Sequence, residues 1–204
     1  MSRDRKVEIV EKKAVFQGYF RVDAYRLKHS LHRGGMSSEI RREVFERGHA
    51  VSVLPYDPAR REVVMVEQFR VGAYAAGSDP WLMEIVAGII DEGETVEQVA
   101  RREVKEEAGL DVRDLFPAAR YLSSPGGSSE SVTHFVAWVD ASGAGGVHGL
   151  DDEDEDIRVV PMTVPEALAL LDGGSLENAQ ALIALQWLAI NENKVRAHWG
   201  FEPV

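Results

Sequence analysis

Residues 88–110 read GIIDEGETVEQVARREVKEEAGL, and this stretch decides the fold. Thr95 is followed three positions later by Gln98, which is a capping box, and Gly109 stands where a helix ends in the left-handed conformation. These signals predict a helix over residues 96–108. Apolar residues recur along it every four positions, so we expect one face to pack on a sheet. The apolar positions are Val96, Ala100, Val104 and Ala108, with Val99 beside them.

The same helix carries Glu103, Glu106 and Glu107 at spacings of three and four, which places the three carboxylates on one face. Like charges at these spacings destabilise a helix by about 0.2–0.5 kcal/mol per pair, although neighbouring Arg and Lys side chains offset part of this. Taken alone, such a run is explained most simply as a solvated charged face. A hard divalent cation binds carboxylate oxygens together with substrate phosphates, so the pattern also suits a metal site beside an anionic substrate.

The rest of the chain indicates a single α/β protein. Its 204 residues can bury one sizeable core and hold a small accessory element. Thr163 opens TVPE, a second capping box, which predicts a helix start. Apolar residues at helical spacing predict another helix over roughly residues 176–193. Strand patterns cover much of residues 1–50 and then residues 50–69, 81–90, 120–124, 131–139 and 157–162.

Composition limits the classes of partner. The net charge is −11, which argues against nucleic acid as the main partner and means that a polyanionic substrate needs a metal bridge. The chain has no Cys, as expected for a reducing compartment. The N-terminus has no long apolar stretch, and the apolar run ALIALQWLAI is short and is broken by Gln186. We therefore expect a cytoplasmic protein with no membrane span.

The spacing of the opening stretch resembles the Nudix box at every specified position, from Gly88 and Glu94 to Arg102 and Gly109. The resemblance implies a Nudix α/β/α sandwich with a mixed sheet. It also implies a loop-helix-loop motif that holds a divalent metal against a diphosphate. The four residues just named then have structural roles. Arg102 orients Glu94 or a neighbouring carboxylate, with a plain surface ion pair as the alternative.

The resemblance also implies the metal ligands. Glu103 and Glu107 correspond to the principal ligands, and Glu106 to a further ligand or to a partner of metal-bound water. The carbonyl of Ala87 supplies another oxygen. Residues 142–156 end in DDEDED, which is most often a solvated loop, but a loop of this length is often a functional lid. Here the resemblance places a general base at Glu153 and a metal ligand at Glu155, with neighbouring acids as alternatives for the base.

Segments outside the box resemble the bacterial ADP-ribose diphosphatase branch of the family over almost the whole chain. They include QGYF, RREVFERGHA, PWLMEIVAG and SPGGSSE, whose Pro125 lies sixteen positions after Gly109. This branch cleaves ADP-ribose to AMP and ribose 5-phosphate with two to three Mg²⁺ ions, or Mn²⁺. It is a homodimer with shared active sites, and its N-terminal β-strand arm is used in dimerisation. The implied domains are an arm over residues 1–48 and a hydrolase domain over residues 49–204.

The resemblance assigns substrate contacts to ten residues, of which the first two, the loop residues and the final Glu reach the site from the partner subunit. They are Tyr19, Phe20, Arg42, Glu43, Arg70, Ile89, Ser124, Pro125, Gly126 and Glu130. From the residue types alone, an Arg fork suits phosphate oxygens, but a surface ion pair is the alternative. An aromatic pair can stack on a purine, but in a strand it more often belongs to a core.

Two other functions fit the same box. One is a Nudix hydrolase that acts on a different nucleoside diphosphate sugar, such as GDP-mannose. The other is a sensor that binds ADP-ribose without turnover. The three Glu residues of the helix and the acidic loop favour an enzyme, since a sensor has no need of a metal-charged site.

Overall fold

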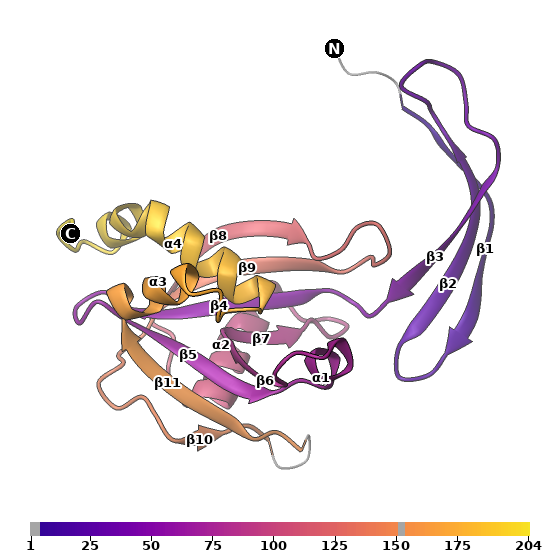
Figure 1. The fold of residues 1–204 in the computed structure, drawn as a ribbon. Coiled ribbons are helices and arrows are strands. Elements are labelled where there is room, and N and C mark those ends of the chain that lie inside the picture. The colour runs from indigo at the N-terminus through magenta and orange to yellow at the C-terminus, as the bar shows by residue number, and fades with distance from the viewer. Residues whose placement is uncertain (1–4, 151–153) are drawn as a thin grey trace. The chain divides into compact units, whose positions relative to one another are not determined.

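The computed structural model describes residues 5–150 and 154–204. They form two compact units (Figure 1). Unit 1 comprises the described residues up to His49 together with Leu122–Ser131. Unit 2 comprises the described residues of Ala50–Tyr121 and Val132–Val204. Unit 2 therefore contains the whole of the predicted box.

Unit 1 is built on a three-stranded antiparallel sheet. Its order is β1 (Val7–Gln17), β2 (Arg21–His29) and β3 (Ile40–Glu46). The segment Leu122–Ser131 is bound to the end of β3 through the backbone. The Phe45 N–H donates to the Gly127 carbonyl at 2.8 Å, and the Ser129 N–H donates to the Phe45 carbonyl at 3.3 Å. This segment and the end of β3 therefore form one local structure.

Unit 2 holds an eight-stranded mixed sheet. Its main path runs β10 (Val147–His148), β11 (Ile157–Thr163), β5 (Glu62–Phe69), β4 (Ala50–Asp57), β9 (Ser131–Trp138) and β8 (Asp114–Leu122). Two short strands lie off this path, with β6 (Trp81–Glu84) paired to β5 and β7 (Val86–Ile89) paired to β4. The β4–β9 pair is parallel, while β4 is antiparallel to β5 and β7.

Helices cover both faces of this sheet (Figure 1). One core lies between the sheet and α2 (Val96–Ala108) and includes Val51 and Val53. The other packs against α3 (Val164–Asp172) and α4 (Ala179–His198) and includes Leu54 and Tyr56. Since β4 contributes to both cores, all eight of its residues are buried. The predicted α/β sandwich with a mixed sheet is confirmed.

The opening stretch folds as predicted. The Thr95 side chain accepts from the Gln98 N–H at 3.2 Å, the Gln98 side chain accepts from the Thr95 N–H at 2.9 Å, and the helix runs from Val96 to Ala108. Gly109 ends it with φ of 70°. Of the predicted stripe, Ala100, Val104 and Ala108 are buried together with Val99 beside them, and Val96 is half-buried against the same core.

Four details differ from the sequence-based prediction. The strand predicted at residues 120–124 begins earlier, at Asp114, and ends at Leu122. The apolar run 81–90 is two strands, because β4 and β5 pair only at Tyr56–Val63 and Asp57–Glu62 and then separate, so β7 and β6 bind to different partners. The last helix begins later, since Asn178 caps it, and continues to His198. A short helix, α1 (Val71–Ala76), was not predicted, and none of its residues is buried.

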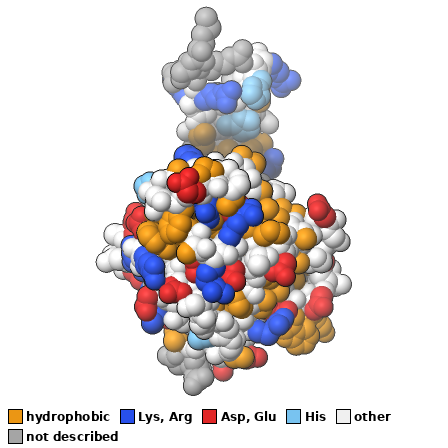
Figure 2. Space-filling model, turned by 90° about the vertical axis from the view of Figure 1, so that its left-hand side faces the viewer, with side chains coloured by type: hydrophobic (Ala, Val, Ile, Leu, Met, Phe, Trp, Pro, Cys, Tyr) orange, Lys and Arg blue, Asp and Glu red, His pale blue; other side chains and the backbone are white. Residues whose placement is uncertain are grey.

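The distribution of surface charge and the character of the helices concern binding to nucleic acid and to membranes. In Figure 2, acidic and basic side chains are interspersed on the face that is shown, so the acidic excess does not form one patch there. Within the described residues, no helix has the length and apolar character needed to cross a bilayer.

Candidate active site

Two of the three α2 carboxylates, Glu103 and Glu107, lie at the face of the helix that meets β7. Glu103 and Glu107 are buried, with 9% and 3% of their surface exposed, while Glu106 is half-buried. The Glu107 carboxylate accepts from the Ala87 N–H at 3.1 Å. This bond leaves the carbonyl of Ala87 as a separate oxygen on the same strand, so the residue named as a backbone ligand lies beside the helix acids.

Gly88 is needed for this close approach of helix and strand. A Cβ atom at Gly88 would overlap the carboxylate of Glu103, which is fixed from its other side by Arg102 at 2.8 Å. Any side chain at this position must therefore displace Glu103 or the helix that carries it.

Arg102 connects the helix to the loop before it. Its guanidinium donates two hydrogen bonds of 3.1 Å to Glu94, one of 2.8 Å to Glu103 and one of 3.1 Å to Glu106. The hydrogen bonds from Arg102 lower the pKa of Glu94, and a bond from the Asp91 N–H adds to this. One guanidinium therefore binds three carboxylates, and among the described residues its ion pairs do not include Glu107.

The buried acids carry more negative charge than their surroundings compensate. Burial raises the pKa of Glu103 to about 7, with Glu106 and Glu155 acting in the same direction and Arg102 opposing them. Burial and the charge of Glu103 raise the pKa of Glu107 well above its ordinary value, although the Ala87 N–H and Arg70 oppose this shift. Each added negative charge makes the next harder to hold.

Arg70 lies next to the same acids, at the end of β5. It donates to both carboxylate oxygens of Glu84, with the shortest contact at 2.7 Å, and Asn178 donates to Glu84 at 2.8 Å. Burial disfavours the charged form of Arg70, but Glu84, Glu107 and Glu155 reverse this and give a net rise in its pKa. The guanidinium therefore stays charged at the edge of the cluster.

The described part of the acidic loop returns to α2. The Gly149 N–H donates to the Glu106 carbonyl at 3.3 Å, and the Leu150 N–H donates to the Glu155 carboxylate at 3.2 Å. Gly149 has φ of 108°, and a Cβ there would meet Glu155. Glu155 is thus placed beside Glu103 and Glu107, whose pKa values it raises. The predicted base, Glu153, lies outside the described residues.

The donor set suits a hard divalent cation. Among the described residues, no group of three or more His, Cys, Asp or Glu side chains is arranged closely enough to coordinate a metal ion. Arg102 binds Glu103 and Glu106, while the Ala87 N–H binds Glu107. The buried and under-compensated carboxylates, with a backbone carbonyl beside them, are nevertheless the oxygen donors that Mg²⁺ or Mn²⁺ binds. The residues present therefore fit a divalent metal.

Apart from Ile89, the remaining predicted contacts lie in unit 1. Tyr19 and Phe20 follow β1, and their rings meet edge to face at 4.7 Å. Glu130 is buried and forms an ion pair of 2.8 Å with Arg47, a residue that the sequence-based assignment missed. The only signal for Arg47 in the sequence is its place directly after a strand and before Gly48.

The other predicted residues of unit 1 form less compact groups. Arg42 and Glu43 are exposed on β3, where Arg42 donates to the Arg41 carbonyl and Glu43 pairs with Arg41. Ser124, Pro125 and Gly126 form a turn, closed by the Gly127 N–H to the Ser124 carbonyl at 3.1 Å. Ile89 lies at the end of β7 in unit 2. The structure thus groups the predicted residues by unit, with the acids, Arg70, Ala87 and Ile89 in unit 2.

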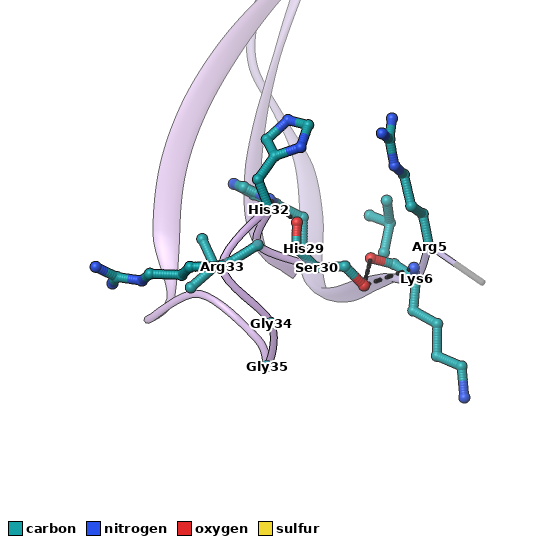
Figure 3. A pocket seen from close by; sticks show the side chains of 10 residues that line it. Arg5, Lys6, His29, Ser30, His32, Arg33, Gly34 and Gly35 are labelled. Atoms are coloured by element: carbon teal, nitrogen blue, oxygen red, sulfur yellow. Dashed lines mark hydrogen bonds between the residues drawn. The ribbon is translucent and has the colours of Figure 1, made fainter. Parts of the chain in front are cut away.

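A cavity of about 680 Å³ in unit 1 contains none of these residues. Its lining comes from residues 5–7 and 29–35 and is rich in basic side chains. Figure 3 shows Arg5, Lys6 and Arg33 pointing in different directions instead of converging on one point. We therefore place the candidate site at α2.

Comparison with known proteins points to the same region. The model of the NUDIX domain matches residues 46–192. ADP-ribose pyrophosphatase of Escherichia coli K12 is 49% identical over 194 residues, covering 95% of this chain and 93% of that protein. The enzyme of the same name from Haemophilus influenzae is 38% identical, covering 95% and 90%.

Two further similarities are more distant. GDP-mannose pyrophosphatase of Enterobacter sp. 638 is 34% identical, covering 91% of this chain and 96% of that protein. A crystal structure described as an ADP compounds hydrolase has a TM-score of 0.70, with 22% identity and 96% coverage of both chains. This last similarity concerns the fold alone.

Proposed function

This chain belongs to the NUDIX family, and we propose that it hydrolyses the diphosphate bond of ADP-ribose to AMP and ribose 5-phosphate. The observation that carries the proposal is the pair of buried, under-compensated carboxylates of Glu103 and Glu107, with the half-buried Glu155 beside them and Arg70 at their edge. Such a group suits a metal-dependent reaction of an anionic substrate. The 49% identity to a relative named ADP-ribose pyrophosphatase supports the choice of substrate.

We propose that Glu103, Glu107, Glu155 and the Ala87 carbonyl hold Mg²⁺, two to three ions per site, with Glu106 as a further ligand and Mn²⁺ as a substitute. Bound Mg²⁺ neutralises charge on the diphosphate and makes it a better electrophile. The fork of Arg70 binds phosphate oxygens, which requires it to share or leave its contacts with Glu84. Glu153 takes a proton from the attacking water as general base.

The same proposal accounts for the predicted contacts in unit 1. Tyr19 and Phe20 supply aromatic surface for the adenine, and Arg42, Glu43, residues 124–126 and Glu130 supply polar contacts. We propose that the protein is a homodimer in which Tyr19, Phe20, residues 124–126 and Glu130 complete the site of the partner subunit. Ile89 borders the substrate from β7, within unit 2.

GDP-mannose is the second candidate substrate, because a relative named GDP-mannose pyrophosphatase is 34% identical over 91% of this chain. A panel of ADP-ribose, ADP-glucose and GDP-mannose, incubated with Mg²⁺ in ¹⁸O-labelled water, separates the two. We expect selective release of AMP and ribose 5-phosphate from ADP-ribose, with the label identifying the attacked phosphorus. Preferred hydrolysis of GDP-mannose would replace the substrate and retain the chemistry.

Binding of ADP-ribose without any turnover would instead favour the sensor. The matched control is the same panel with EDTA in place of Mg²⁺, which we expect to abolish hydrolysis. A chain that turns over no member of the panel and binds none would contradict the whole proposal.

A further inference from the structure

A buried acid in unit 2, Glu84, connects Arg70 to the first residue of a distant helix. Glu84 is the last residue of β6, and only 3% of its surface is exposed. Its Oε2 accepts from Arg70 at 2.7 and 3.0 Å, while its Oε1 accepts from Arg70 at 3.2 Å and from the Asn178 side chain at 2.8 Å. Asn178 is 94 residues away in the sequence, so only the fold brings it to this acid.

Asn178 uses both ends of its side-chain amide. Its Oδ1 accepts from the Ala181 N–H at 2.9 Å and so caps α4, while its Nδ2 donates to Glu84. A cap needs only the oxygen, because Asp and Ser cap helices about as well as Asn does. The contact of Nδ2 with Glu84 is therefore a second role of this residue, separate from the cap.

The contact with Glu84 leaves part of the Arg70 guanidinium available. Nε and Nη2 donate to Glu84, whereas Nη1 has no hydrogen-bond acceptor among the described residues. The Arg70 side chain is 42% exposed and that of Glu84 is 5% exposed, so the acid is buried while the arginine reaches the surface. A guanidinium has five N–H groups in one rigid plane, so it can bind a carboxylate with one edge and phosphate oxygens with another.

We propose that Asn178 is a positioning residue that fixes Glu84, and through it Arg70, so that the free edge of the guanidinium faces the diphosphate. This inference rests on the proposed function, in which Arg70 binds phosphate oxygens. Without Asn178, the Oε1 atom of Glu84 loses its neutral donor, and the carboxylate no longer holds Arg70 in one direction. Because Arg70 contacts the phosphates before and during the reaction, the loss weakens substrate binding more than it slows the chemical step.

The test is Asn178→Ser, which removes the donor to Glu84 and keeps a side chain that caps α4. The melting temperature should therefore stay near the wild-type value. We expect the KM for ADP-ribose to rise about tenfold, with kcat within about threefold. The Kd for ADP-ribose, measured by calorimetry in EDTA to prevent hydrolysis, should rise by a similar factor. Asn178→Asp also keeps the cap but places a second carboxylate beside Glu84, so it should weaken binding further.

Asn191→Ser is the matched control. It is the same substitution in the same helix, and it also removes a side-chain amide, which donates to the Trp187 carbonyl at 2.9 Å. We expect this variant to have the KM and Kd of the wild type. An equal loss in both variants would point to a general disturbance of α4 and overturn the inference, as would an unchanged Kd in Asn178→Ser.

A double-mutant cycle tests whether Asn178 acts through Arg70. Arg70→Lys replaces the planar fork with a single ammonium group, which has no second edge for Glu84 to fix. In this background Asn178→Ser should change the Kd for ADP-ribose by less than about twofold, since the residue on which it acts has gone. A further tenfold loss would show that Asn178 acts by another route and would overturn the inference.

The Kd in EDTA also separates this inference from the proposed function. A wild type that binds ADP-ribose without hydrolysing it, with binding weakened in Asn178→Ser, would overturn the function and support the role of Asn178. Hydrolysis by wild type with KM and Kd unaffected by Asn178→Ser would do the reverse. A wild type that neither hydrolyses nor binds ADP-ribose would overturn both.

Discussion

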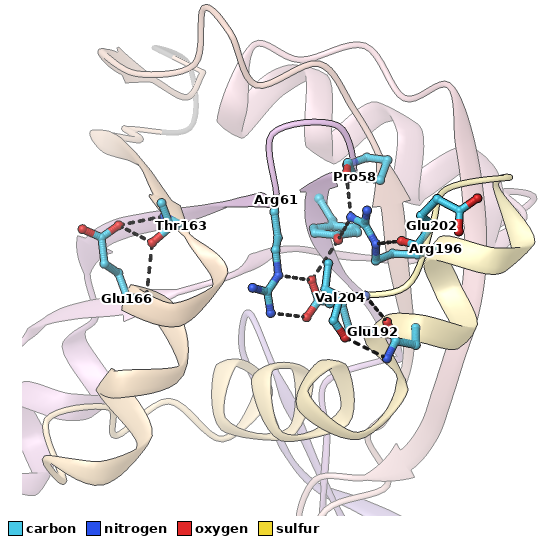
Figure 4. A network of polar contacts seen from close by, with 10 residues as sticks. Pro58, Arg61, Thr163, Glu166, Glu192, Arg196, Glu202 and Val204 are labelled. Carbon is cyan, nitrogen blue, oxygen red and sulfur yellow. Dashed lines mark hydrogen bonds and ion pairs between the residues drawn. The ribbon is translucent and has the colours of Figure 1, made fainter.

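Unit 2 contains two groups of buried carboxylates whose electrostatics are opposite. On α4, Glu192 is 7% exposed and accepts from Arg61 at 2.8 and 2.9 Å and from the Tyr56 hydroxyl at 3.0 Å (Figure 4). Arg196 donates to the same hydroxyl at 3.1 Å and to the Pro58 carbonyl at 2.7 Å. Burial raises the pKa of Glu192, but Arg61, Tyr56 and Arg196 outweigh it, and the net shift is downward.

On α2, burial is similar but compensation is poor, so the pKa values of Glu103 and Glu107 move upward. The comparison shows that burial alone does not mark a functional acid. Glu192 has two arginines within its network and ties α4 to the β4–β5 turn, which is a structural role. On α2, Glu103 and Glu106 share Arg102 while Glu107 has no ion pair with it, so negative charge is left for a cation.

The largest effect is expected from removing one α2 charge. We expect Glu107→Gln to lower kcat by about 10²–10³-fold, because Glu107 is a proposed ligand of the metal that stabilises the transition state. The melting temperature measured in EDTA should stay the same or rise, since a buried, repelling charge has been removed. Steady-state kinetics with ADP-ribose and calorimetric melting check the two expectations. A fall in melting temperature comparable to that of a core mutation would remove the distinction between the two groups.

Glu192→Gln is the opposite case. Here we expect the free energy of unfolding to fall by about 2 kcal/mol, because the substitution removes the charged acceptor of two hydrogen bonds from Arg61 and the negative charge near the buried Arg196. Denaturant unfolding measures this loss. The kcat of the folded fraction should stay near the wild-type value, so a large loss of kcat at a temperature where the variant is folded would contradict a purely structural role.

The two groups also predict opposite dependences on pH. The pKa of Glu103 is about 7 in the folded protein against an ordinary 4.5, so the folded state binds this proton more tightly. The stability from this group is complete below pH 4.5 and is lost as pH rises toward 7. Glu107 acts in the same direction. Glu192, with a lowered pKa, contributes stability that is present above pH 4.5 and is lost on acidification.

Melting curves between pH 4.5 and 7.5, in EDTA and in Mg²⁺, measure this dependence. We expect the stabilisation by Mg²⁺ to increase across this range, because the ion relieves a repulsion that grows as the acids ionise. Glu103→Gln should reduce the increase, whereas Glu192→Gln should leave it in place. A stabilisation by Mg²⁺ that does not vary with pH would contradict the claim that the α2 acids are less well compensated than Glu192.

The sequence predicts local features of the fold better than it predicts long-range pairing. The capping boxes at Thr95 and Thr163 and the glycine at 109 place two helices correctly, because these signals act within a few residues. The division of residues 81–90 into two strands was not predictable, since it depends on β4 and β5 separating far away in the sequence. The spacing of Glu103 and Glu107 indicated a shared face.

Which basic side chains neutralise each buried acid, in contrast, could be seen only in the structure. Glu192 reads as an ordinary helix residue, and its partners Arg61 and Tyr56 are more than one hundred residues away in the sequence. The contacts of Arg47 were hidden for the same reason, because Glu130 and Phe20 reach it from distant segments. A sequence shows which acids share a helix face, but it does not show which cations reach them.

The smallest expected effect comes from the helix caps. Thr95 and Thr163 make equivalent capping boxes, so replacing either with Ala should lower the free energy of unfolding by about 1 kcal/mol. Their effects on catalysis should differ, because α2 carries the acids and α3 does not. Fraying at Thr95 loosens the loop that Glu94 and Arg102 tie to the helix, so Thr95→Ala should lower Mg²⁺ affinity a few-fold. Mg²⁺ titrations of hydrolysis for both variants measure this difference, and equal Mg²⁺ affinities would show that the carboxylates are held by strand contacts such as that of Ala87 with Glu107.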